Sequence, residues 1–540
     1  MSEEKKDGTT EGTSSSNGQQ KMGWVVYPMG SRPTWGMSIL LGIQHYLTMF
    51  GATVIIPFMT GIAVGMPQAE LSLLISTMFF VSGITTLVQQ SALGNKLPII
   101  QGGTFSFLGP MFAIVGMVGA QELGWEASIQ QVSAAVMFSS IVPIILGYSG
   151  LIGYIKRAIS PIVIGPTIAM IGLALYNAGA PWMRENWAIS LITLLALILF
   201  SQVFARKSKV FLLFPVLLAI LTGWLAALLG TLTGIIPEGD PANLLMAPDI
   251  GGMGVMVNNL ELIGDAPWIS LMPAMPFKWG LPQITEITLA GSFGMLAGVL
   301  GSTVESIGDY YSCARMAEAP VPTERMISKG IGAQGLGCLI ASIFQTGNGT
   351  TSYSENIGAI ALTRVASRRV IRTGAVLMLI IPLFGKFGAV LSTMPKPVVG
   401  AMFVGMFGLI AAVGLSNLQF VNLNNSRNLF IIGLSFFAGL TFPYAFNPQL
   451  TETAIPLTAG DPGSAIYIIT NILQTILTTG MAVTAIVGLV LDNLLPGATR
   501  KERGLEEWET MATEEAWIEA EKEWAQMAIG EERKVNFSEK

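Results

Sequence analysis

The sequence predicts an all-α polytopic membrane protein whose fourteen transmembrane spans form two inverted repeats of seven. Three observations lead to this fold class. Charged residues make up only 12% of the 540 residues, about half the share of soluble domains, and hydrophobic residues make up 51%. Apolar stretches of membrane-spanning length recur along the whole chain. Two of these stretches, at equivalent places in the two halves, begin with short segments that favour extended backbone.

A helix that crosses the bilayer needs about 20 mostly apolar residues. Stretches of this kind are predicted at 36–58, 71–91, 98–117, 130–150, 159–178, 187–205, 210–236, 284–313, 326–345, 350–366, 370–391, 397–416, 427–447 and 465–494. The long connection 237–283 is rich in Gly, Pro and Met. The spans and their connections together make one predicted transporter domain, residues 36–496.

The distribution of basic residues predicts that both termini are cytoplasmic. Loops on the cytoplasmic side of this topology carry fourteen Lys and Arg, and opposite loops carry Arg184, Lys278 and Lys396, with Lys386 assigned to neither side. The fourteen are Lys96, Lys156, Arg157, Arg206, Lys207, Lys209, Arg315, Arg325, Lys329, Arg364, Arg368, Arg369, Arg372 and Arg427. We therefore expect a multi-pass protein of the cell membrane, in contact with the lipid bilayer.

The two ends of the chain are polar. Residues 1–35 are predicted to be a disordered cytoplasmic tail, and the first twenty residues lack the apolar core of a signal peptide. Residues 497–540 are predicted to be an acidic, helical, cytoplasmic tail, a charge that argues against nucleic-acid binding. Cys313 and Cys338 lie in apolar segments and indicate small buried side chains rather than a disulfide framework.

The third span of each half is unusual. Span three begins with LPIIQGGTFSFLGP and span ten with TGNGTTSYSENIG, and both segments are rich in Gly, Thr and Ser. An odd number of spans per half inverts the second repeat, and matching interrupted spans indicate a binding site between the repeats. We expect residues 101–108 and 350–356 to face each other near the bilayer midplane. Each would lead into a half-helix whose N-terminus points at the substrate.

Glu305 lies deep in span eight, Asp309 lies in the same span, and Glu355 lies in span ten. Ionisable groups at membrane depth are costly, and the default interpretation is a functional site. Glu305 has no cationic neighbour in sequence, so burial favours its protonated form, as proton-coupled binding requires; a packing role is the alternative. Glu355 begins the second half-helix, where it either binds substrate or caps the helix. Asp309 lies one turn after Glu305 and could relay protons, hydrogen-bond Asn356, or serve structure alone.

Further candidates lie in spans one and three. His45, the single histidine of the chain, is expected to orient a neighbour by hydrogen bonding, and direct substrate contact by His45 or Gln44 is the alternative. Phe105 could stack on a planar substrate or simply pack. No metalloprotease, P-loop, nucleophile-elbow or dinucleotide motif stands out, so we expect no enzyme activity, cofactor or metal.

Several segments together resemble the nucleobase/ascorbate transporter family, the xanthine/uracil permeases of the nucleobase:cation symporter type. ENIGAIALTR at 355–364 is similar to the family signature. Further matches are QHYLTMFGATVIIP at 44–57, QGGTFSF at 101–107, VESIGDYYSCAR at 304–315, SRNLFIIGLSFFAGL at 426–440 and LDNLLPG at 491–497. The resemblance covers residues 36 to about 504.

This resemblance implies a core domain at about 36–150 and 284–391, a gate domain at about 159–236 and 397–494, a homodimer formed through the gate domains, and elevator-like movement of the core. It also implies roles for single residues. The substrate would be bound by Glu305, Glu355, the stacking Phe105, Ser354 through its backbone, and Tyr353. The supporting network would comprise His45, Gln44, Asp309, Asn356 and Thr104.

The resemblance also bears on the substrate. Xanthine and uric acid transporters usually have Gln at the first signature position and ascorbate carriers Pro, whereas Glu355 is typical of uracil and broad nucleobase transporters. Purine-specific relatives tend to have an Asp in span nine, but residues 330–349 contain no carboxylate. We expect uptake of a nucleobase such as uracil or xanthine, coupled to protons. Sodium coupling, an anion exchanger of the same fold, a membrane-embedded lipid enzyme and a non-transporting receptor are the alternatives.

Overall fold

The computed structural model of the protein describes residues 25–119, 122–152, 160–174, 176–208, 210–211, 215–237, 239–240, 242–243, 260–446, 451, 453–455, 457, 465–505 and 514–527. Parts of the predicted tails and basic loops lie outside the described residues. These parts are residues 1–24, Lys156, Arg157, Lys209, 506–513 and 528–540.

Helices occur in every one of the predicted spans. The first half contains α1 (Trp35–Thr48), α2 (Phe50–Ala63), α3 (Gln68–Gln89), β1 (Gln101–Gly103), η1 (Phe105–Phe107), α4 (Leu108–Gly119), α5 (Gly124–Tyr148), α7 (Pro161–Ala174), α8 (Tyr176–Glu185), α9 (Trp187–Ile198), η2 (Leu199–Val203), η3 (Phe204–Arg206) and α11 (Pro215–Leu232). The connection that follows contains α12 (Leu260–Asp265) and η4 (Met272–Ala274).

The second half contains α13 (Glu286–Met316), α14 (Glu324–Ile343), β2 (Thr350–Ser352), α15 (Ser354–Thr363), α16 (Arg368–Ile380), η5 (Ile381–Leu383), α17 (Gly385–Ser392), α18 (Lys396–Ser416), η6 (Asn417–Phe420), α19 (Ser426–Phe446), α20 (Ala465–Thr478) and α21 (Gly480–Leu494). The last helix, α23 (Glu514–Ala525), lies in the C-terminal tail.

Within the described ranges, seven helices are long and apolar enough to cross a membrane. The number rises to eight if α16 and α17, which meet at an angle of 83°, form one bent span. Other predicted spans are divided into shorter helices, for example α1 with α2 and α20 with α21. The structure confirms the helical membrane fold, and the number of fourteen spans stays a prediction.

Local sequence accounts for the ends of the long helices around the site. The Thr285 hydroxyl accepts a hydrogen bond from Thr288 N at 3.3 Å at the start of α13, and Glu286 lies in the first turn. Arg315 lies in the last turn of the same helix, so both ends carry the charge that the helix dipole favours. Thr323 caps α14 in the same way through Met326 N.

The two predicted extended segments pair with each other. β1 and β2 form an antiparallel two-stranded sheet, with Gln101 opposite Ser352 and Gly103 opposite Thr350. Every residue of both strands is buried. A Cβ at Gly102 would lie 2.5 Å from the Tyr353 ring, so only glycine allows this close approach. The expectation that these segments face each other is confirmed, and their depth in the bilayer stays a prediction.

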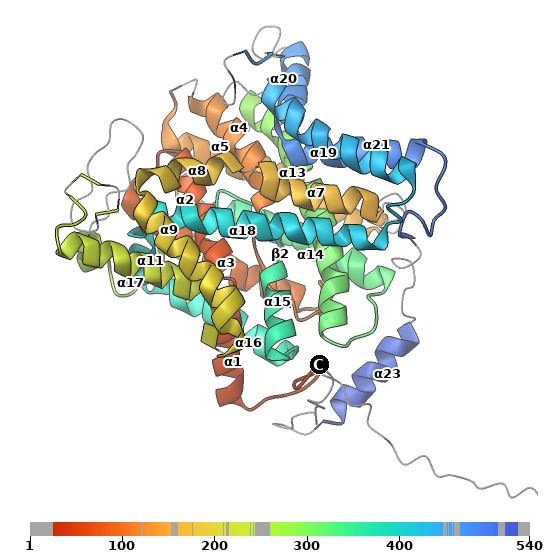
Figure 1. Cartoon of the computed structure of the whole chain (residues 1–540), viewed down its shortest axis with the longest axis horizontal. Helices are drawn as coiled ribbons and strands as arrows, with labels where there is room; N and C mark the ends of the chain where they lie inside the picture. Colours follow the sequence, from red (N-terminus) through yellow and green to blue (C-terminus); the bar gives the residue numbers. More distant parts are fainter. Residues whose placement is uncertain are drawn as a thin grey trace, which may run out of the picture.

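The helices pack in two groups. The first helix group consists of α1–α5 and α13–α17, in which α14 and α13 pack on α5, and α16 packs on α1 and α3. The second helix group consists of α7, α8, α9, α11 and α18–α21, in which α18 packs on α7, α8 and α9, and α21 on α19 and α7 (Figure 1). The sheet lies within the first group, and α13 borders the second through α7, α20 and α21.

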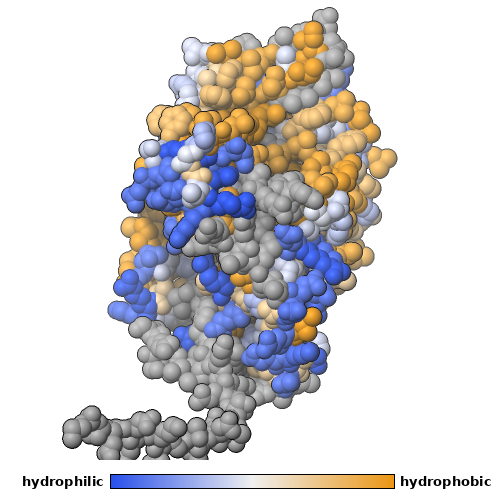
Figure 2. Space-filling view, turned by 90° about the vertical axis from the view of Figure 1, so that its right-hand side faces the viewer, coloured by the Kyte–Doolittle hydropathy of each residue, from blue (hydrophilic) through white to orange (hydrophobic). Residues whose placement is uncertain are grey.

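One end of the molecule is polar. Figure 2 shows hydrophilic residues across the middle and lower part of the face seen from the right of Figure 1, with hydrophobic residues gathered above them. Helix α23 lies at the same end, below α14 and α15 in Figure 1. This placement agrees with a helical segment in the predicted C-terminal tail.

Candidate functional site

Glu305, Asp309 and Glu355 lie together near the sheet. Glu305 and Asp309 are one turn apart on α13, and Glu355 lies in the first turn of α15. The Glu305 carboxyl faces the hydroxyls of Ser106 and Thr351, and it is close enough to Asp309 and Glu355 for their charges to interact. Glu305 and Glu355 are half-buried. The two interrupted segments therefore meet beside this group of acids.

Asp309 is fixed by the start of α15. The Ser354 hydroxyl donates to Asp309 Oδ1 at 2.8 Å, and the residue is 6% exposed. Its Oδ2 has no hydrogen-bond partner among the described residues. The alternative prediction for Asp309, a hydrogen bond to Asn356, is wrong. The side chain of Asn356 instead contacts Ile100 and His45.

Asn356 links three elements. Its Oδ1 accepts from Ile100 N at 2.9 Å, next to β1, and its Nδ2 lies 3.0 Å from His45 Nδ1 on α1. Because Oδ1 accepts from a backbone N–H, the amide nitrogen faces the imidazole, and Nδ1 acts as the acceptor. His45 is fully buried and also hydrogen-bonds the backbone of Val365. In this arrangement His45 orients Asn356, while the Nε2 of the neighbouring buried Gln44 has no partner among the described residues.

An aromatic residue follows each strand of the sheet, Phe105 after β1 and Tyr353 after β2. Phe105 is 8% exposed, and its ring meets that of Phe407 on α18 edge to face, with centroids 5.1 Å apart. Phe407 in turn stacks on Phe403 at 5.3 Å. The Tyr353 hydroxyl accepts from Thr53 at 3.2 Å and lies near the charges of Glu305 and Glu355. Phe105 therefore touches the second helix group from within the first.

Small polar groups hold the extended backbone in place. Thr104 Oγ1 accepts from Ser106 N at 3.1 Å, and Asn348 Oδ1 accepts from Thr104 N at 2.9 Å. Gln101 donates two further hydrogen bonds, from N to Thr86 at 2.9 Å and from Nε2 to Ser352 at 2.8 Å. Strand backbone without these partners would be too costly inside a membrane.

Several site residues escaped the sequence analysis. They are Ser106, Thr351, Ser302, Ser306, Gln334, Asn348 and Phe407. A signal existed for those on α13, because Ser302, Glu305, Ser306 and Asp309 recur at the spacing of one helix face. Hydroxyl and amide side chains elsewhere in the spans are too common to mark a site alone.

The charge balance of the site decides its chemistry. Within the part of the chain that the structure describes, no lysine or arginine forms an ion pair with Glu305, Asp309 or Glu355. Two short helices, η1 and α15, begin at the strand ends, where backbone N–H groups and dipoles favour acceptors. The site therefore offers carboxylate acceptors, backbone groups and an aromatic face to one small polar molecule.

A bundle of apolar helices, with two interrupted helices meeting at lone carboxylates, defines a class of protein, the membrane transporters with broken helices at the binding site. A sequence model of the Permease family, the xanthine/uracil permeases, matches residues 36–447. The chain belongs to this family, whose members are membrane transporters and not enzymes.

Curated relatives agree with this assignment. The chain is 40% identical over 520 residues to solute carrier family 23 member 2 of Mus musculus, covering 90% of this chain and 76% of that protein. It is 32% identical over 495 residues to nucleobase-ascorbate transporter 1 of Arabidopsis thaliana, covering 90% of this chain and 92% of that protein. The solved structure of SLC26A9 has a TM-score of 0.51 at 13% identity, covering 74% of this chain and 62% of that one, a likeness of fold alone.

Proposed function

We propose that the protein is a symporter that takes up a nucleobase such as uracil or xanthine across the cell membrane, coupled to protons. The observation that carries this proposal is the pair of carboxylates, Glu305 and Glu355, beside the β1–β2 sheet without a cationic partner among the described residues. Such carboxylates can accept hydrogen bonds from the N–H groups of a planar base. Phe105 is the stacking surface, and Tyr353 and the Ser354 backbone complete the pocket.

The proposed cycle uses the carboxylates as the proton carrier. Glu305 accepts a proton from outside, the base then binds between the interrupted spans, and both are released inside. Asp309, held by Ser354, and Asn356, held by His45, keep the start of α15 in register with β1. Gln44 and Thr104 support the same region. Because the proton is a co-substrate, uptake increases as the external pH falls.

The proposed movement follows the packing of the helices. In an elevator-type mechanism the first helix group, which contains the sheet and all three carboxylates, acts as the core domain and moves past the second, the gate domain. The edge contact between Phe105 and Phe407 would then part in each cycle. We further propose that both termini are cytoplasmic and that two copies associate through their gate domains.

One uptake experiment tests the proposed substrate and the proposed coupling ion. Radiolabelled uracil and xanthine are offered, at several external pH values, to cells that lack their own nucleobase permeases and produce the protein. A protonophore, or replacement of sodium by choline, separates proton from sodium coupling. Uptake that depends on sodium and ignores the protonophore would replace the proton assignment.

Competition decides between substrate classes in the same cells. An excess of unlabelled base should abolish uptake. Competition by ascorbate, which the names of relatives include, would widen the substrate range. Sulfate or bicarbonate as effective competitors would favour an anion exchanger and contradict the nucleobase site.

A further inference from the structure

Helix α23 in the C-terminal tail is held by two tryptophans on one face. Trp517 and Trp524 are seven residues apart and are 7% and 4% exposed, whereas Ile518 between them is 54% exposed. The two rings meet edge to face, with centroids 6.2 Å apart. Such burial of large aromatic side chains fixes the helix to the surface beneath it.

That surface belongs to the first helix group. Trp517 Nε1 donates to Val321 O at 2.9 Å, in the connection between α13 and α14. Trp524 covers Gly30, where an added Cβ would collide with the Cβ of the tryptophan. Arg368, at the start of α16, pairs with Glu521 at 2.8 Å. The helix therefore rests on the ends of the elements that carry Glu305, Asp309 and Glu355.

The N-terminal segment under α23 is part of the same unit. Val26 N donates to Arg364 O at 2.9 Å, Ala366 N to Tyr27 O at 2.8 Å, and Arg368 N to Met29 O at 3.0 Å. These bonds join the segment to the end of α15 and the start of α16. A force on α23 would thus reach the half-helix that begins at the candidate site.

The chain just before α23 is fastened to the second helix group. Arg503 Nη2 lies 2.8 Å from Asp492 Oδ2 on α21, and Asn428 Nδ2 on α19 donates to Glu502 O at 2.9 Å. Leu505 is 2% exposed. Only eight residues, 506–513, join this fastened segment to the first residue of α23. The C-terminal chain therefore spans both helix groups.

We propose that α23 is a latch that holds the first helix group against the second and has to leave its surface before the first group can move. This inference rests on the proposed function, because it assumes relative movement of the two groups. We expect α23 to detach from the first helix group more easily than the segment around Arg503 detaches from the second. Its ion pair to the first helix group involves Glu521, which is 52% exposed, whereas Arg503 pairs with a fully buried carboxylate.

The first test measures movement without any substrate. Nitroxide labels are placed on Leu93→Cys in the first group and Leu423→Cys in the second, whose native side chains are 50% and 41% exposed. Protein without introduced cysteines is the labelling control, since Cys313 and Cys338 are buried. We expect one narrow distance distribution in the parent protein and an additional distance in the Trp517→Ala/Trp524→Ala variant. Ile518→Ala is the matched control and should resemble the parent.

The second test measures transport. We expect the double tryptophan variant to take up substrate several-fold faster. A reducible thiol cross-linker that joins Arg368→Cys to Glu521→Cys, whose native side chains form an ion pair at 2.8 Å, should slow uptake several-fold until reductant is added. Unchanged distances in the tryptophan variant, or parental uptake by the cross-linked form, would overturn the latch. If the parent protein takes up no base at all, the proposed function fails, and the distance measurement still decides on the latch.

Discussion

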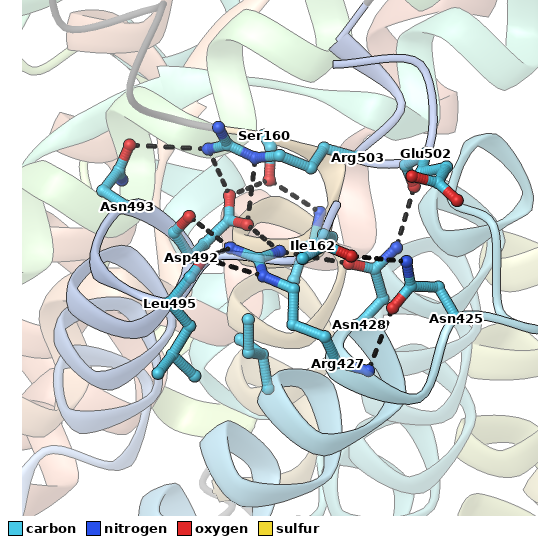
Figure 3. A network of polar contacts seen from close by, with 12 residues as sticks. Ser160, Ile162, Asn425, Arg427, Asn428, Asp492, Asn493, Leu495, Glu502 and Arg503 are labelled. Carbon is cyan, nitrogen blue, oxygen red and sulfur yellow. Dashed lines mark hydrogen bonds and ion pairs between the residues drawn. The ribbon is translucent and has the colours of Figure 1, made fainter. Parts of the chain in front are cut away.

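Buried carboxylates lie in both helix groups of this protein, and their partners differ. Asp492 on α21 has a fully buried side chain, with Arg427 at 2.9 Å, Arg503 at 2.8 Å and the Ser160 hydroxyl at 2.6 Å (Figure 3). Glu305, Asp309 and Glu355 have hydroxyl groups, backbone and one another as neighbours. Two guanidinium groups neutralise the carboxylate of the second helix group, and no described cation pairs with those of the first.

The difference in partners indicates a structural role for Asp492 and supports the functional role proposed for the other three carboxylates. A carboxylate between two guanidinium groups is neutralised and satisfied, so it joins the elements that carry its partners. Those elements are α19, α21, the start of α7 and the segment around Arg503. Carboxylates without cations can instead exchange a proton or accept a ligand. The same type of side chain therefore joins the elements of one helix group and, in the proposed function, binds substrate and proton in the other.

The largest expected effect comes from removing the charge of Asp492, which pairs with Arg427 and Arg503. Asp492→Asn leaves two partly buried guanidinium groups without their counter-charge, and we expect it to lower the free energy of unfolding by about 3–5 kcal/mol. Thermal unfolding in detergent measures the loss. Leu494→Ala, at a position two residues further on that is 74% exposed, is the control. An Asp492→Asn protein as stable as the parent would remove the distinction between the two kinds of carboxylate.

The second largest effect is expected on the rate of uptake, with little change in the free energy of unfolding. Glu305→Gln keeps the shape of the side chain and can still hydrogen-bond Ser106 and Thr351, but it cannot accept a proton. We expect uptake to fall at least about 100-fold, equivalent to about 2.7 kcal/mol, while the unfolding temperature stays within about 2 °C of the parent. Near-parental uptake would show that this carboxylate is not the coupling group.

The third effect concerns specificity. Glu355→Gln replaces an acceptor-only group at the start of α15 by one that also donates. A hydrogen bond to a charged group contributes about 1.5–3 kcal/mol, so the apparent affinities of competing bases should change by about tenfold or more and in unequal measure. Competition by a panel of unlabelled bases measures the order of their apparent affinities in the variant and in the parent. If the order is unchanged, this position does not select the base.

The smallest effect comes from Lys278, a half-buried cation outside both sets of carboxylates. Lys278 donates to Phe344 O at 2.8 Å and lies 4.6 Å from the Trp279 ring, and burial lowers its pKa to about 7, opposed by the nearby Glu70. Below about pH 7 the folded protein bears the full cost of the buried charge, and the cost declines as pH rises toward the unfolded pKa.

Lys278→Met removes this cost together with the hydrogen bond to Phe344. We expect a net gain of about 1 kcal/mol at acidic pH that diminishes as the pH rises above 7. The difference between the unfolding temperatures of the variant and the parent, measured at pH values below and above 7, tests this expectation. A stability difference that widens as the pH rises would contradict burial of the charge as its cause.

Much of the fold and the acids of the site could be predicted from local sequence. Apolar length indicated the helices, and the runs QGGT and GTTS predicted the extended segments that form β1 and β2. Glu305, Asp309 and Glu355 stood out because charge is rare within the spans. Ser106, Thr351 and Phe407 did not, because hydroxyl and aromatic side chains are frequent there and acquire a role only from what they face.

By itself, the sequence determined that this chain belongs in a membrane, which segments are helical or extended, and which acids lie among apolar residues. These properties depend on composition and on neighbours within a few turns. Only the tertiary structure decided the antiparallel register of β1 and β2, the contacts of Asp492 with Arg427 and Arg503, and the return of α23 to cover Gly30. Such contacts join segments far apart along the chain, so their energies arise only when the packed helices bring those segments together.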